Sequence, residues 1–124
     1  MNKNDLRFQK TEKLIKETYI SLKKHGSTIV KVKELCEVAL INKTTFYAHY
    51  ETIEHLHKQV CIEFVTEMLG QCYNIENIFT DTHDFVYTVL GIFMDNMPQI
   101  EKLYGDDFHQ LVNDAETVLM EKYF

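Results

Sequence analysis

Apolar residues recur along most of the chain at steps of three and four positions, the spacing that places them on one face of an α-helix. The β-branched run around Val30 is too short to found a sheet. A first helix is predicted over residues 5–25, with Gly26 as its stop. The apolar face of this helix would consist of Leu14, Ile15, Thr18, Tyr19 and Leu22.

The pattern predicts further helices up to residue 72. A short helix over residues 32–39 is followed by a turn, and Asn42 is a good N-cap for another short helix that reaches Tyr50. Thr52 can cap a longer helix that continues to about residue 72. The inward residues would be Val32, Leu35, Cys36 and Ala39 in the helix over residues 32–39, and Leu56, Val60, Phe64 and Met68 or Leu69 in the longer one.

The second half of the chain continues in the same way after a polar link beyond Tyr73, so the predicted fold class is all-α. A helix is predicted over residues 82–96, and Pro98 begins a short one that Gly105 ends. Asp106 or Asp107 opens a last helix. The apolar faces would be Phe85, Val89, Ile92 and Phe93 in the helix over residues 82–96, and Phe108, Leu111, Val112, Ala115, Val118 and Leu119 in the last one.

The composition is that of a single globular domain, with 124 residues of which 45% are hydrophobic and 26% charged. The three cysteines form no Cys-x-x-Cys pair, so we expect no disulfide framework and a reducing compartment. No apolar run approaches the ~18 residues of a membrane span. No apolar stretch follows the charges at the start of the chain, which argues against a secretory signal. We therefore expect a cytoplasmic protein with no membrane partner.

The net charge of −6 is divided unequally between the two halves of the chain. Residues 1–60 hold 11 Lys and Arg against 7 Asp and Glu, a net +4, whereas residues 61–124 hold 2 Lys against 12 Asp and Glu, a net −10. Such an asymmetry suggests that the first half meets a polyanion, with Arg7, Lys10, Lys43 and Lys58 as candidate phosphate contacts. Chance segregation of charges on solvated faces is the alternative.

The segment 42–50 has the residues that a DNA-recognition helix needs. Two short helices joined by a tight turn are typical of a helix-turn-helix, in which the second helix enters the major groove. Phe46 and Tyr50 stand four apart and can anchor the helix to the core, which leaves the hydrogen-bond donors on the remaining arc. An amphipathic surface helix without a partner has the same periodicity. The donors are Lys43, Thr44, Thr45, Tyr47 and His49.

One stretch of the first half resembles the signature of the TetR/AcrR family of bacterial transcriptional regulators: VKELCEVALINKTTFYAHYETIEHL. The resemblance covers roughly residues 7–60, and the run Thr-Phe-Tyr-x-His-Tyr is far more specific than a generic helix-turn-helix pattern. It implies an N-terminal three-helix DNA-binding domain over residues 1–52. A helical effector-binding and dimerisation domain would follow over residues 53–124, linked through the long fourth helix. The matching positions are Ala39, Ile41, Asn42, Thr45, Phe46, Tyr47, His49, Tyr50 and Leu56.

The resemblance also implies roles for single residues. Thr45, Tyr47 and His49 match positions that usually grip the DNA backbone. Lys43 and Thr44 match exposed positions that can reach base edges. The full set of expected DNA-binding residues is Lys31, Lys33, Asn42, Lys43, Thr44, Thr45, Tyr47, Ala48 and His49.

Three positions depart from the family pattern. Leu40 stands where the family turn has Gly, and it is strained there if the position needs a positive φ. Lys31 stands where Thr commonly caps the first helix of the motif, and Ile53 stands where a Lys commonly clamps a phosphate. Lys31 and Lys33 are candidates to replace that contact.

In this family the second half holds the effector pocket and the dimer interface. The resemblance therefore implies a homodimer on a palindromic operator, most often a repressor, which is released when a small molecule binds. Family members are usually longer, so the C-terminal domain would be truncated, or the chain would be part of a longer molecule. Aromatic and Met residues at helical spacing can also simply fill the core. The residues expected to line the pocket are Phe85, Val89, Phe93, Met97, Tyr104 and Phe108.

Other function classes find less support in the sequence. It contains no Gly-rich phosphate loop, no Gly-x-Ser-x-Gly and no His-Glu-x-x-His, so we expect no enzyme. Cys36, Cys61 and Cys72 are widely spaced among apolar residues, so we expect no metal and no cofactor. The alternative to a regulator is a protein-interaction or co-regulator subunit with weakened DNA binding, which Leu40, Ile53 and the net negative charge favour.

Overall fold

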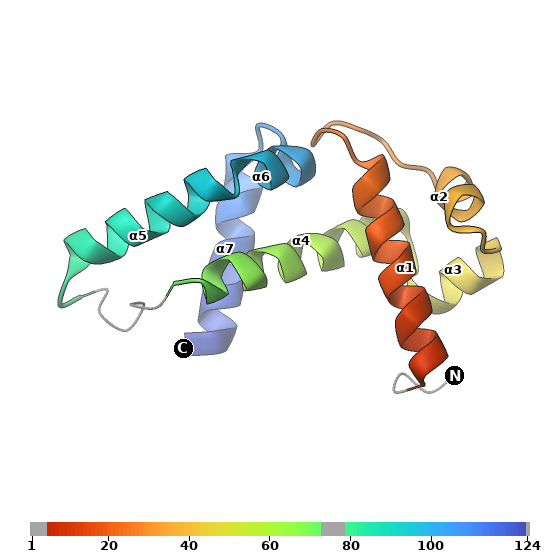
Figure 1. Ribbon diagram of the computed structural model, residues 1–124, viewed down its shortest axis with the longest axis horizontal. Helices are drawn as coiled ribbons and strands as arrows, with labels where there is room; N and C mark the ends of the chain where they lie inside the picture. Colours follow the sequence, from red (N-terminus) through yellow and green to blue (C-terminus); the bar gives the residue numbers. More distant parts are fainter. Residues whose placement is uncertain (1–4, 73–78, 124) are drawn as a thin grey trace.

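The computed structural model describes residues 5–72 and 79–123. In these residues there are seven helices and no strand, so the predicted all-α class is confirmed for the described chain. The polar link expected beyond Tyr73 lies outside the described residues. The helices are α1 (Leu6–Leu22), α2 (Val32–Ala39), α3 (Lys43–His49), α4 (Ile53–Gly70), α5 (Thr82–Asp95), α6 (Met97–Tyr104) and α7 (Phe108–Tyr123) (Figure 1).

Side-chain caps explain where several helices begin. The Asn42 side chain accepts a hydrogen bond from the backbone N–H of Thr45 at 2.7 Å, and the Thr52 hydroxyl accepts one from His55 at 3.0 Å. Both caps were predicted from the sequence and are confirmed. Of the two residues predicted to open α7, Asp107 accepts from the backbone N–H of Gln110 at 3.1 Å.

The first helix ends three residues earlier than predicted, at Leu22. Lys23 leaves the helical conformation, and its buried ammonium donates to the carbonyls of Gly26 at 3.0 Å and Thr28 at 2.6 Å. These bonds fold the chain into a compact loop ahead of α2. Gly26 therefore lies inside the loop and does not cap the helix, which corrects its expected role as a helix stop.

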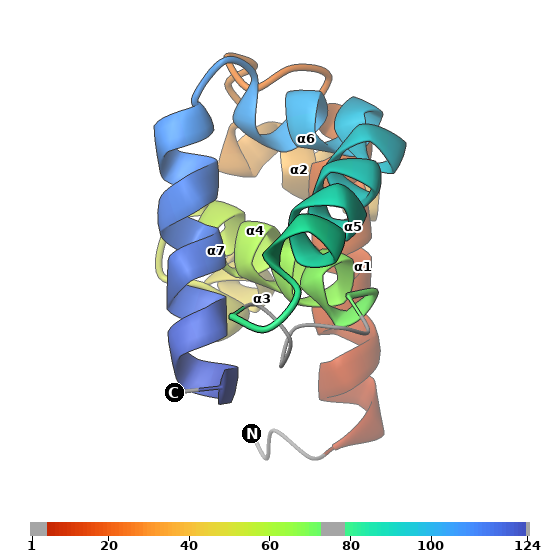
Figure 2. The ribbon, with the colours of Figure 1, turned by 90° about the vertical axis from the view of Figure 1, so that its left-hand side faces the viewer.

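The long helix α4 is the centre of the molecule. It packs against α1 on one side and against α5 and α7 on the other, while α2 packs against α1 and α3 packs against α2 (Figures 1 and 2). The predicted inward residues of α4 are buried, apart from Phe64, which is half-buried against the core. The core thus runs along α4 and joins the two halves of the chain.

The buried face of α1 differs from its prediction at two positions. Leu14 is 40% exposed, whereas Phe8, outside the expected face, is only 7% exposed. Phe8 is buried because its ring stacks on the ring of His49, with centroids 3.9 Å apart. The stacking fixes the start of α1 against the end of α3.

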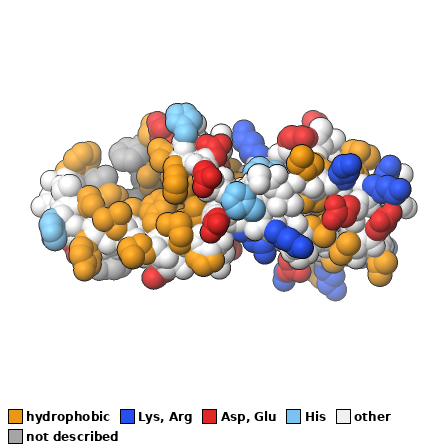
Figure 3. Space-filling view, turned by 90° about the horizontal axis from the view of Figure 1, so that it is seen from above, with side chains coloured by type: hydrophobic (Ala, Val, Ile, Leu, Met, Phe, Trp, Pro, Cys, Tyr) orange, Lys and Arg blue, Asp and Glu red, His pale blue; other side chains and the backbone are white. Residues whose placement is uncertain are grey.

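Charge and apolar surface divide along the length of the molecule. Lys and Arg side chains gather at the end formed by α1 to α3, and hydrophobic side chains dominate the view at the end formed by α5 (Figure 3). None of the described helices combines the length and the apolar character that crossing a bilayer requires.

Candidate nucleic-acid interface

The short helix α3 is held to the core by two aromatic side chains. Phe46 is completely buried and Tyr50 is 2% exposed, as their four-residue spacing predicted. Since these two residues fix the inner face, the rest of the helix faces away from the core. Tyr47 is 53% exposed, and Lys43 is exposed as well.

The residues predicted to contact DNA are arranged on this outer arc. Asn42, Lys43, Thr44, Tyr47 and Ala48 are exposed, and Thr45 and His49 are half-buried. The carboxamide oxygen of Asn42 is occupied by its capping bond, so this residue shapes the start of the helix in addition to facing outward.

A groove of about 370 Å³ separates the start of α1 from α3. It brings Arg7, whose side chain is 92% exposed, beside the hydroxyl-bearing residues of α3. Thr11 also lines the groove, and the sequence analysis missed it. Its spacing of four from Arg7 on one helix is the signal that could have found it. The groove is lined by Arg7, Thr11, Asn42, Thr44, Thr45, Ala48 and His49.

The turn between α2 and α3 has the positive φ at which Leu40 was expected to be strained. Leu40 lies in the left-handed region, with φ 58° and ψ 43°, and it is 91% exposed. The backbone N–H of Ile41 then donates to the carbonyl of Cys36 at 3.1 Å, and Ile41 packs against the core. The left-handed conformation costs about 1–2 kcal/mol in a residue that has a Cβ.

His49 is held in a neutral state. Burial lowers its pKa below the ordinary value of 6.5, although Glu12 partly opposes the shift. Its Nδ1 atom is buried and has no hydrogen-bond partner. At neutral pH this imidazole can offer a phosphate a neutral N–H, which is weaker than a contact from a charged ring.

Lys31 and Lys33 are both exposed around the start of α2. Lys31 precedes the helix and makes no side-chain cap. It lines the same surface cavity as Ile53, the first residue of α4. An ammonium group is thus available near Ile53.

The loop between α1 and α2 is bonded to the far half of the molecule. The backbone N–H of Gly26 donates to the carbonyl of Glu101 in α6 at 3.1 Å. A Cβ added at Gly26 would lie 2.3 Å from the backbone nitrogen of Gly105 and 2.4 Å from the carbonyl carbon of Tyr104. Only glycine permits this approach.

A chain of buried polar groups crosses the same junction. The Tyr19 hydroxyl of α1 lies 2.6 Å from Nδ1 of His57 in α4, and Nε2 of that ring lies 3.4 Å from the Cys61 sulfur. Burial lowers the pKa of His57, with a further contribution from Lys23, and raises the pKa of the Cys61 thiol to about 11. The imidazole is neutral and the thiol protonated at pH 7, and a protonated thiol is a weak nucleophile.

The network continues toward the C-terminal end. The Tyr104 hydroxyl of α6 donates to the buried carboxylate of Asp114 in α7 at 2.6 Å, and the side chain of Gln110 donates to the same carboxylate at 3.0 Å. These bonds connect α6 to α7 at the side of α4.

The six residues predicted to line an effector pocket lie in different surroundings. Tyr104 is buried and bonded to Asp114, whereas Met97 is 40% and Phe108 56% exposed. Phe85, Val89 and Phe93 are half-buried against the core. Their ligand-binding role stays a prediction.

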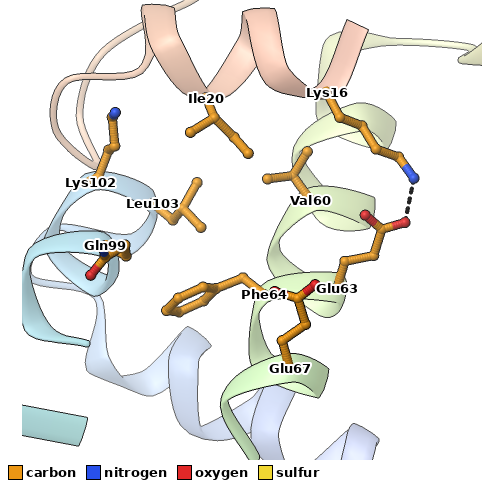
Figure 4. A pocket seen from close by; sticks show the side chains of 9 residues that line it. All are labelled: Lys16, Ile20, Val60, Glu63, Phe64, Glu67, Gln99, Lys102 and Leu103. Atoms are coloured by element: carbon orange, nitrogen blue, oxygen red, sulfur yellow. Dashed lines mark hydrogen bonds and ion pairs between the residues drawn. The ribbon is translucent and has the colours of Figure 1, made fainter. Parts of the chain in front are cut away.

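A cavity of about 200 Å³ lies between α1, α4 and α6, and none of its lining residues was predicted from the sequence to bind a ligand (Figure 4). Ile20, Val60 and Leu103 point into it from the three helices. An ion pair between Lys16 and Glu63 lies at one side and joins α1 to α4. The lining residues are far apart in the sequence, so no local pattern predicts the cavity.

The described residues contain no group of three or more His, Cys, Asp or Glu side chains placed to hold a metal ion. The three cysteines are buried. No family model, no curated protein and no solved structure matches this chain.

Proposed function

We propose that the protein is a one-component transcriptional regulator of the TetR/AcrR type, a repressor, that binds a palindromic operator as a homodimer. The observation that carries the proposal is the outer arc of α3. Phe46 and Tyr50 hold its inner face, which leaves Lys43, Thr44 and Tyr47 exposed beside Arg7.

In this account α2, the turn at Leu40 and α3 form a helix-turn-helix, and α3 enters the major groove. Lys43 and Thr44 reach base edges, and the Lys43 ammonium also lies beside a phosphate. Thr45, Tyr47 and His49 bind the backbone together with Arg7. Phosphate contacts fix the register, and base-edge contacts supply the sequence preference.

The distribution of charge along the chain supports binding of DNA at the α1–α3 end. Residues 1–60 carry a net +4 and residues 61–124 a net −10, so DNA is attracted to the α1–α3 end and repelled from the other. Lys31, beside Ile53, is the residue we assign to the phosphate contact of the missing Lys.

The dimer is supported by exposed apolar residues on two helices of the second half. On α5, Tyr87 is 75% and Met94 72% exposed, and on α7, Phe108 is 56% and Val112 60% exposed. Surface of this kind is stabilised when a second copy covers it.

The small-molecule effector is assigned to the cavity between α1, α4 and α6. A ligand there contacts α1 of the DNA-binding unit and α6 of the other half at once. Binding would favour the orientation of the two units that spaces the recognition helices wrongly for consecutive major grooves.

A co-regulator subunit that binds protein through the same end is the second candidate. The exposed Leu40, together with Val38 at 55% and Ile29 at 81% exposed, favours it because these apolar side chains offer no contact to phosphate.

Selection from a pool of random DNA duplexes, read out by fluorescence anisotropy at low salt, tests the proposal. We expect one palindromic sequence to be enriched and to bind the protein as a dimer. Uniform binding to all duplexes, or none, would contradict the regulator and favour the co-regulator.

A further inference from the structure

The cavity between α1, α4 and α6, to which the proposed function assigns the effector, has an apolar floor. Val60 and Leu103 are buried, Phe64 is half-buried, and Ile20 is 37% exposed. These side chains come from all three helices and line the middle of the cavity (Figure 4). Pockets for drug-sized ligands measure about 300–1,000 Å³, so a cavity of about 200 Å³ takes a smaller molecule with an apolar body.

The rim of the cavity holds a cation without a partner. Residues 61–124 contain 2 Lys and 12 Asp and Glu, yet no carboxylate in the part of the chain that the structure describes lies within ion-pair distance of Lys102. The other ammonium of the lining, Lys16, is paired with Glu63 (Figure 4). Lys102 thus carries an unpaired charge beside an apolar cavity, where an anionic group of a ligand can neutralise it.

A second hydrogen-bond donor belongs to the same wall. Gln99 precedes Lys102 by three positions on α6, so the two side chains share a face of the helix, and both line the cavity. The Gln99 carboxamide makes no hydrogen bond to a described residue. A carboxylate has two oxygens, so one can accept from the Lys102 ammonium and the other from the Gln99 carboxamide.

The unpaired carboxylate of the rim lies on the other side of the cavity. Glu67 belongs to α4, and Figure 4 shows the side chains of Phe64 and Leu103 between it and Lys102. Glu67 is exposed whereas Lys102 is half-buried, so water screens the charge of the carboxylate more than that of the ammonium. An anionic group at Lys102 is therefore bound more strongly than a cationic group at Glu67.

We propose that this cavity binds a small carboxylic acid with an apolar body, in its ionised form. The carboxylate accepts hydrogen bonds from the Lys102 ammonium and the Gln99 carboxamide, while the apolar body covers the floor formed by Ile20, Val60, Phe64 and Leu103. The role of this acid as the effector rests on the proposed function. Its binding takes place without DNA and can be measured alone.

Titration of the full chain with sodium phenylacetate, followed by two-dimensional NMR of the backbone amides at constant ionic strength, tests the site. We expect saturable shifts in residues 16–20, 60–67 and 99–103. Phenylacetamide has the same shape without the charge, and phenylethylammonium reverses the charge, so both should bind about tenfold more weakly. Absence of saturation up to about 10 mM, or binding of either comparison compound as tight as that of phenylacetate, would overturn the proposal.

Two lysine variants make the test specific. Lys102→Met removes the ammonium and keeps most of the aliphatic stem, so it should weaken phenylacetate binding about tenfold and leave phenylacetamide binding unchanged. Unchanged phenylacetamide binding shows that the cavity is still folded. Lys13→Met alters an exposed residue of α1 outside the cavity and should change neither affinity. Equal binding of phenylacetate by the two variants would overturn the assignment of Lys102.

Failure of this inference and failure of the proposed function give different results. If selection yields an operator but phenylacetate does not bind, the regulator stands and the carboxylate site is wrong. If phenylacetate binds as described but no operator is found, the carboxylate site stands and the regulator is wrong.

Discussion

Replacement of Gly26 by Ala tests how tightly the two halves of the molecule are joined. The new Cβ would lie 2.3–2.6 Å from three backbone atoms of residues 104 and 105, far inside ordinary contact distance. Backbone atoms cannot rotate away as a side chain can, so the α1–α2 loop must move off α6. That movement breaks the hydrogen bond from Gly26 to Glu101, which is 3.1 Å long.

The expected cost follows from these two effects. Loss of one hydrogen bond costs about 1 kcal/mol, and overpacking of a close contact costs about 1–3 kcal/mol. We therefore expect Gly26→Ala to lower the free energy of unfolding by about 2–4 kcal/mol, which corresponds to a fall in Tm of roughly 8–15 °C for a domain of this size.

Urea and thermal denaturation followed by circular dichroism provide the assay, and the chain contains its own control. Gly91 lies inside α5, and a Cβ added there meets nothing within 4 Å. Gly91→Ala should therefore raise stability by about 0.5–1 kcal/mol through helix propensity. The reasoning is refuted if Gly26→Ala unfolds within about 0.5 kcal/mol of the native protein while Gly91→Ala behaves as expected.

Two other predictions concern the turn and the histidines. Leu40→Gly relieves the left-handed strain and should raise the free energy of unfolding by about 0.5–1 kcal/mol. As a control, Val38→Gly on the exposed side of α2 should lower the free energy of unfolding by about 1 kcal/mol. A loss of stability in Leu40→Gly would show that the turn is not strained. His49 and His57 have pKa values lowered by burial, so the unfolded chain takes up protons below about pH 6.5 before the folded chain does. The urea midpoint should be constant above about pH 6.5 and fall as the pH drops below it, and the fall should be smaller in His57→Gln. A midpoint that is unchanged between pH 7 and pH 5.5 would contradict the lowered pKa values of the two histidines.

Local patterns predicted the helices well where the signals lie within a few residues of each other. The bounds of α2 and the capping roles of Asn42 and Thr52 follow from apolar spacing and from side chains that reach their own helix. The anchoring of α3 by Phe46 and Tyr50 also follows from a spacing of four.

Features that depend on contacts between residues far apart in the sequence could not be predicted from local patterns. Gly26 has the local signature of a helix stop, but its role is set by a contact with residues about eighty positions away. The pairing of Tyr19 with His57 joins residues 38 apart. The cavity between α1, α4 and α6 collects its lining from three helices, so it becomes visible only when the helices are packed.

The salt dependence of DNA binding tests the central claim most directly, that α3 lies against duplex DNA. For the native protein we expect log K to fall with log salt with a slope of about 3 to 4 per bound protomer, and for Lys43→Ala a slope smaller by about 0.9. Lys102→Ala, on α6 and away from α3, should keep the native slope. A Lys43→Ala slope equal to those of the native protein and Lys102→Ala would place α3 off the phosphates and contradict the account.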